Sequence, residues 1–141
     1  MMKKRSAKRP GARLGQHFLT GTWAADKLVE AAGIGAGDVA LEIGPGEGAL
    51  TKRLLATGAH VVAVEKDPPL VEKLRKTFVS ELERGQFVLL EEDVRSSDPK
   101  QLGLTDKGYV LAANIPYYIT GEIIRQFLTT LVQPRTIAIL I

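Results

Sequence analysis

Short apolar runs alternate along the chain with stretches in which apolar residues recur every three or four positions. The runs have the length and composition of strands buried in a parallel sheet. The predicted strands are 39–43, 60–65, 87–90, 109–113 and 136–141. Helical spacing predicts four helices, at about 22–32, 48–57, 68–84 and 120–131. This alternation predicts a doubly wound α/β fold with a mostly parallel sheet.

The same pattern predicts which helix faces are buried and where the sheet ends. The buried stripe expected in the first helix consists of Trp23, Leu28, Val29 and Ala32. The stripe expected in the third helix consists of Leu70, Val71, Leu74 and Phe78. The last apolar run reaches the end of the sequence without a cap or a return. We therefore expect a sheet truncated after about five strands, whose open edge another chain or further strands would cover.

Composition narrows the class of protein. The chain has 141 residues, of which 45% are hydrophobic and 25% charged, as in a single soluble domain. The absence of cysteine excludes disulfides and cysteine ligands, and we expect no metal site. No apolar run approaches the ~20 residues of a membrane span, and the N-terminus lacks the apolar segment of a secretory signal. A cytoplasmic protein without membrane attachment is the expectation.

Charge is distributed unevenly around the net value of +3. Residues 1–16 contain six basic residues and no acid, whereas the remainder has 13 basic and 16 acidic residues. Blocks of like charge are often arms that bind nucleic acid, although such a block can also be a solvated tail. We predict a basic, flexible arm at 1–14 followed by one domain at 15–141.

Three glycines follow the first predicted strand and precede a helix: Gly44, Gly46 and Gly48. Glycine accepts unusual backbone conformations and lets a ligand approach the main chain, while the helix offers free N–H groups. Ligands of open α/β sheets bind there, beyond the carboxyl ends of the strands. The loop is typical of a nucleotide site, although glycine pairs also occur in ordinary turns.

Acidic residues follow the next two predicted strands. Glu65 lies 21 residues after Gly44, a spacing suited to an acid that accepts hydrogen bonds from ribose hydroxyls. Asp93 can accept a hydrogen bond from the amine of an adenine, or belong to a solvated acidic turn with Glu91 and Glu92. Because the carboxyl ends of parallel strands share one edge, a single extended ligand can contact all of these positions.

A dinucleotide is the competing ligand, because Gly44, Gly46 and Ala49 also satisfy the dehydrogenase pattern. That ligand places a pyrophosphate at the helix N-terminus, where Glu47 stands. A carboxylate repels a pyrophosphate but not a zwitterionic, sulfonium-bearing ligand. This favours S-adenosylmethionine over NAD as the cofactor.

The segment Asn114-Ile115-Pro116-Tyr117 suits methylation of an amino group on a nucleobase. The lone pair of such an amine is delocalised, and two hydrogen-bond acceptors favour a tetrahedral nitrogen. The Asn114 side chain can be one acceptor, and the carbonyl of Ile115, held extended by the following proline, can be the other. Tyr117 can stack on an extruded base. An arbitrary sequence of this kind is otherwise a turn closed by proline.

Five segments together resemble a known family. They are Gly-Gln-His-Phe-Leu at 15–19, Glu-Ile-Gly-Pro-Gly at 42–46, Val-Glu-Lys-Asp at 64–67, Glu-Asp-Val at 92–94 and Asn-Ile-Pro-Tyr-Tyr at 114–118. In order and spacing they resemble the motifs of the ribosomal RNA adenine N6,N6-dimethyltransferases, which include the small-subunit dimethyladenosine transferases and the erythromycin-resistance methylases. The run at 114–120 resembles the small-subunit enzymes more closely.

The resemblance implies a Rossmann-like, class I S-adenosylmethionine-dependent methyltransferase that acts on adenine N6 in small-subunit ribosomal RNA. The implied cofactor-binding residues are Gln16, His17, Leu19, Gly44, Gly46, Glu65, Lys66, Asp93, Val94 and Asn114. The implied catalytic residues are Asn114, Ile115, Pro116 and Tyr117. Family members also have further strands and a helical RNA-gripping domain beyond the point where this chain ends. We therefore expect cofactor binding by this chain and little turnover.

Two other functions stay open at this point. The same chemistry serves other amines, such as a DNA adenine or a protein glutamine. A non-catalytic module that binds RNA or S-adenosylmethionine is the second alternative. The basic arm favours nucleic acid over protein as the partner.

Overall fold

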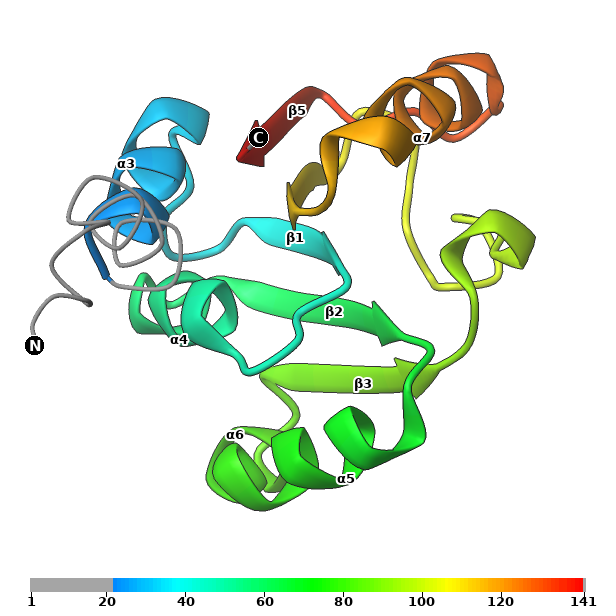
Figure 1. Ribbon diagram of the computed structural model, residues 1–141. Helices are drawn as coiled ribbons and strands as arrows, with labels where there is room; N and C mark the ends of the chain where they lie inside the picture. Colours follow the sequence, from blue (N-terminus) through cyan, green and yellow to red (C-terminus); the bar gives the residue numbers. More distant parts are fainter. Residues whose placement is uncertain (1–21, 141) are drawn as a thin grey trace, which may run out of the picture.

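The computed structural model describes residues 22–140. The predicted arm at 1–14 and the predicted site residues Gln16, His17 and Leu19 lie outside the described residues. The elements are α3 Thr22–Ala32, β1 Val39–Ile43, α4 Ala49–Ala56, β2 His60–Glu65, α5 Pro68–Thr77, α6 Val79–Glu83, β3 Phe87–Glu91, the 3₁₀ turn η1 Val94–Ser96, β4 Val110–Asn114, α7 Tyr117–Thr129 and β5 Thr136–Leu140. Figure 1 traces them along the chain.

The five strands form one sheet in the order β3-β2-β1-β4-β5, and every neighbouring pair is parallel. The chain first moves outward from β1 to β3 and then returns to the other side of β1 for β4 and β5. The order therefore reverses between β1 and β4, which is where ligands of doubly wound sheets bind. The predicted fold class is confirmed.

Apolar side chains cover both faces of the sheet, as expected for parallel strands. On one face, α3, α4 and α5 contribute buried residues such as Leu28, Leu54 and Leu74 to a single cluster. On the other face, Ile123 and Phe127 of α7 are fully buried against the sheet. The strand ends are thus held between two packed layers, which fixes the loops that follow them.

The helix predicted at 68–84 is divided in two at Phe78. This residue has φ −114° and ψ 35°, outside the helical region, and separates α5 from α6. Its buried ring packs edge-on against Phe87 of β3, with ring centroids 5.5 Å apart. The predicted burial of Phe78 is confirmed, whereas the break in the helix at this residue was not predicted from the continuous helical spacing.

Other expectations were wrong in detail. Trp23 is 56% exposed, because α3 turns its small residues Ala24 and Ala25 toward the core. The fourth strand is shifted by one residue and includes Asn114, and α7 begins at Tyr117, three residues earlier than expected. The predicted catalytic segment therefore includes the last residue of β4, a two-residue connection and the first residue of α7.

Candidate functional site

The glycine loop, residues 44–48, follows β1 and leads into α4. Its first residue continues the sheet, because the Gly44 N–H donates to the Val64 carbonyl at 2.9 Å. Gly48 has φ 95°, and a Cβ added to it would lie 2.8 Å from Cε2 of Phe78. Only glycine fits both the backbone conformation and the close approach. The ring of Phe78, at the break between α5 and α6, therefore lies close against Gly48.

Glu65 braces this loop from the neighbouring strand. Its side chain is buried at the end of β2, where Oε1 accepts from the Gly46 N–H and Oε2 from the Asp67 N–H, both at 3.1 Å. Each carboxylate oxygen has a second lone pair that these bonds do not use. The acid thus joins the loops after β1 and β2, and it retains acceptor capacity for a ligand.

A second buried acid is Glu42 of β1, to which neither the motifs nor the family resemblance assigned a role. It is 1% exposed, and it stands in register between Ala63 of β2 and Ala112 of β4. Thr51 of α4 donates its hydroxyl to Glu42 Oε1 at 2.6 Å. Burial raises the pKa of Glu42 from 4.5 to about 8, with the Thr51 hydrogen bond acting against this and the Glu65 charge adding to it. The contact ties α4 to β1.

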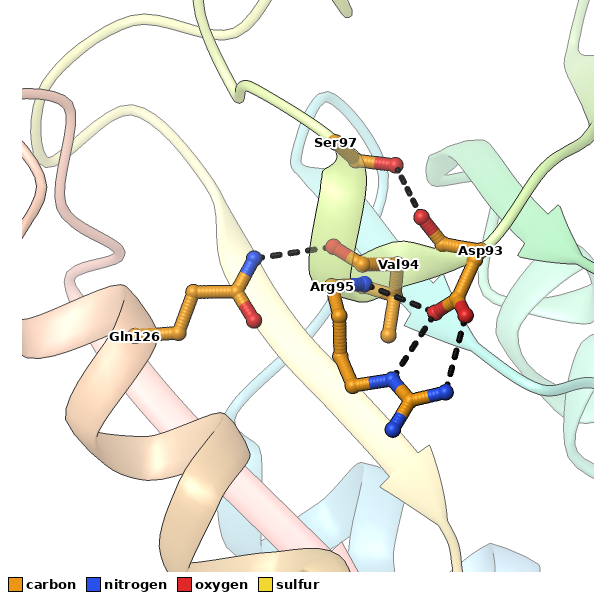
Figure 2. Close-up of polar contacts among 5 residues, drawn as sticks. All are labelled: Asp93, Val94, Arg95, Ser97 and Gln126. Carbon is orange, nitrogen blue, oxygen red and sulfur yellow. Dashed lines mark hydrogen bonds and ion pairs between the residues drawn. The ribbon is translucent and has the colours of Figure 1, made fainter.

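Asp93 lies just past β3 and is already engaged by Arg95, as Figure 2 shows. The Arg95 N–H and Nε donate to Oδ1 at 3.0 and 3.2 Å, and an Arg95 terminal nitrogen donates to Oδ2 at 2.9 Å. The side-chain hydrogen bond from Arg95, followed by the backbone one, lowers the pKa of Asp93 to about 2, and the charge of Lys66 acts in the same direction. Asp93 is therefore an ionised acceptor whose carboxylate is held in one orientation. No motif in the sequence pointed to Arg95 as the partner of Asp93.

The segment after β4 adjoins the glycine loop. Ile115 is buried, and its Cγ2 would lie 3.7 Å from a Cβ added to Gly44, which is ordinary van der Waals contact. Pro116 has φ −57° and ψ 141° and directly precedes α7. Asn114 is exposed at the rim, and Tyr117 is 76% exposed. The exposed ring of Tyr117 thus lies two residues after Ile115, whose side chain is near the glycine loop.

The predicted residues therefore fall into two groups. A hydrogen bond connects Gly46 with Glu65, and the side chain of Ile115 lies near Gly44. Asp93 and Val94 lie at the end of β3, two strands away from β1 in the sheet. Between residues 22 and 140, no His, Cys, Asp and Glu side chains gather in a group suited to a metal ion. In the same range, no helix is long and apolar enough to cross a bilayer.

Glu47 bears on the choice between S-adenosylmethionine and a dinucleotide. It stands before Gly48, the N-cap of α4, and its exposed carboxylate forms an ion pair with Lys73 of α5. The partner partly neutralises the charge that would repel a pyrophosphate. The electrostatic preference for a zwitterionic ligand is therefore weaker than the sequence suggested.

Comparisons with known proteins agree with this arrangement. The family model described as ribosomal RNA adenine dimethylase matches residues 7–141. A ribosomal RNA small subunit methyltransferase A from Dehalococcoides mccartyi is 37% identical over 128 residues, which cover 91% of this chain and 43% of that protein. The chain therefore spans less than half of the length of this relative.

Two solved structures share the fold. The 23S rRNA methyltransferase ErmE superimposes with a TM-score of 0.66 and 25% identity, over 78% of this chain and 42% of that one. A dimethyladenosine transferase from Plasmodium falciparum gives a TM-score of 0.63 and 28% identity, over 79% of this chain and 38% of that one. The five-stranded sheet is thus that of the methyltransferases.

Proposed function

Because the chain belongs to the ribosomal RNA adenine dimethylase family, we propose that it binds S-adenosylmethionine and serves N6,N6-dimethylation of adenines in small-subunit ribosomal RNA. The observation that carries this proposal is the proximity of two loops. Glu65 accepts a hydrogen bond from the glycine loop, and the side chain of Ile115 lies near Gly44. A cofactor on the first loop would lie next to a base held by the second.

The cofactor side of the proposal uses residues from four strand ends. Glu65 accepts hydrogen bonds from ribose hydroxyls with the lone pairs that the loops leave unused. Asp93 accepts from the adenine amine, and Val94 lies beside that ring. Gly44, Gly46, Lys66 and Asn114 complete the described part, and Gln16, His17 and Leu19 the part outside it. When bound, S-adenosylmethionine supplies an electrophilic methyl group on a sulfonium.

On the target side, Asn114 and the Ile115 carbonyl accept hydrogen bonds from the adenine amine, and Tyr117 stacks on the extruded base. The two acceptors favour a tetrahedral nitrogen whose lone pair points toward the methyl donor. The amine becomes acidic once it is alkylated, so no strong general base is needed. The gain in rate comes from positioning and preorganised electrostatics.

Calorimetry with S-adenosylmethionine on the 141-residue chain tests the proposal. Glu65→Ala should weaken binding by about 1.5–3 kcal/mol, the range for hydrogen bonds to a charged group. Glu91→Ala is the matched control, because Glu91 pairs in register with Glu65 at the end of β3 but is exposed. Equal affinities of the two variants and the parent chain would remove Glu65 from the site. Failure of the parent chain to bind would contradict the proposed function itself.

A further inference from the structure

The segment after β3, residues 92–97, meets α7 through the apolar packing of Val94, the charge of Glu122 near Arg95, and a hydrogen bond from Gln126. Gln126 Nε2 donates to the Val94 carbonyl at 2.8 Å, across 32 positions of sequence. Figure 2 shows the Gln126 amide reaching from the helix toward the turn that also carries Asp93 and Arg95. The other hydrogen bonds drawn there, from Arg95 and Ser97 to Asp93, remain within the segment. Gln126 thus fixes the turn from outside.

Packing on α7 determines where Gln126 can point. The adjacent residue Phe127 and Ile123, one turn earlier, are both 0% exposed on the face that meets the sheet. Gln126 is half-buried at the edge of this face. The helix cannot rotate without displacing the two apolar side chains, so the amide is held against the segment.

The helix connects this contact to the proposed target site. α7 begins at Tyr117, directly after Asn114, Ile115 and Pro116. Gln126 stands nine positions after Tyr117, which is about 14 Å along a helix at roughly 1.5 Å per residue. A helix transmits a displacement of one end to the other as a rigid element. One helix, α7, therefore joins two segments. The loop at 114–117 leads into its first turn, and Gln126, near its other end, is bonded to the turn that bears Asp93 and Val94.

We propose that Gln126 is a positioning residue that couples cofactor binding at the 92–97 segment to the order of the first turn of α7. The coupling rests on the proposed function, because it requires Asp93 and Val94 to contact S-adenosylmethionine. Cofactor binding to this segment restrains the Val94 carbonyl, and the hydrogen bond from Gln126 then restrains α7 as well. The target-base loop is then arranged before RNA arrives.

The test is hydrogen exchange of the peptide covering 117–122, measured with and without saturating S-adenosylmethionine. In the parent chain the ligand should slow exchange in this peptide. The Gln126→Met side chain keeps the length of glutamine but has no N–H. This variant should lose more than half of the ligand-dependent protection, and its affinity for S-adenosylmethionine should fall roughly three- to tenfold. Gln126→Lys restores a donor and should recover the protection.

Gln133→Met is the matched control. Gln133 Nε2 donates to the Leu128 carbonyl at 2.7 Å, so its loss removes the same type of bond to α7 without touching the 92–97 segment. This variant should keep the full protection. If Gln126→Met does not fold, Gln126→Glu gives the same comparison, because a carboxylate at neutral pH is similar in shape and offers no N–H.

The outcomes separate the two proposals. Binding with unchanged protection in Gln126→Met, or no ligand-dependent protection in the parent chain, overturns the coupling and leaves the proposed function in place. Equal loss in Gln126→Met and Gln133→Met shows a general structural effect and also overturns it. If the parent chain binds no S-adenosylmethionine, the proposed function fails, and the coupling fails with it.

Discussion

Replacing Glu42 with glutamine should remove a pH dependence from the stability of the fold. Glu42 is fully buried between two alanines of neighbouring strands, and its pKa is raised from 4.5 to about 8. At a pH between 4.5 and about 8, Glu42 keeps its proton in the folded chain and loses it in the unfolded chain. The free energy of unfolding therefore falls as pH rises through this window. The contribution is fully present below pH 4.5 and lost above about pH 8.

The size of the effect follows from the shift in pKa. One pKa unit corresponds to about 1.4 kcal/mol, so the window accounts for at most about 5 kcal/mol of a total stability of roughly 5–15 kcal/mol. The glutamine side chain in the Glu42→Gln variant would keep an oxygen for the Thr51 hydroxyl and cannot ionise. The difference in unfolding free energy between Glu42→Gln and the parent should grow by about 1.4 kcal/mol per pH unit between roughly pH 5.5 and 7.5.

Urea denaturation followed by circular dichroism at half-unit steps from about pH 5 to 9 measures this difference. Other titrating groups cancel, because both chains contain them. Thr51→Val provides a second check: the Thr51 hydrogen bond lowers the pKa of Glu42, so its loss should extend the falling region to higher pH. Parallel curves for the parent and Glu42→Gln would show that Glu42 ionises normally, and the reasoning would be refuted.

Three further predictions concern the rim of the sheet and the arm. Arg95→Ala should raise the pKa of Asp93 from about 2 toward 3.8, as measured by carbon-detected NMR titration of the carboxyl group. An unchanged pKa would contradict the pairing of Asp93 with Arg95. In a protein extended to the length of the family members, Asn114→Ala should depress single-turnover methylation far more than RNA affinity. Tyr117→Ala should lower both, with about 1–3 kcal/mol lost from base stacking. Equal losses of rate and affinity for Asn114→Ala would argue against an acceptor that acts on the reacting amine. Deleting residues 1–12 should make RNA binding less dependent on salt, because fewer phosphates would be neutralised, and should leave cofactor affinity unchanged. An identical salt dependence with and without these residues would indicate that the arm serves only solubility.

The sequence predicted the parts of the fold that depend on local pattern. Runs such as 60–65 are apolar through their middle without interruption, so their burial on both faces and their parallel pairing follow directly. Glu65 was recognisable because it ends such a run at the expected spacing from Gly44. Its hydrogen bond to the Gly46 N–H was not predicted, and its role toward a ribose stays a prediction.

Other features depend on contacts that no spacing encodes. Phe78 continues the helical pattern of α5, and only its partners Gly48 and Phe87 explain the break. Trp23 is the largest apolar residue of α3, but the close approach of α3 to the core selects alanines. Gln126 resembles any polar residue at the edge of a helix, because its partner Val94 lies 32 positions away.

The ring of Phe78 beneath Gly48 also limits how this protein can be engineered. A combinatorial library randomised at position 48 alone should return glycine, since any side chain meets the ring as well as the unfavourable φ of 95°. A library that also replaces Phe78 with smaller residues removes the steric conflict and leaves only the backbone preference, which asparagine tolerates better than most residues. The two positions should therefore show epistasis. Some sequences of the glycine loop should therefore become accessible only when Phe78, at the break between α5 and α6, is varied together with the loop.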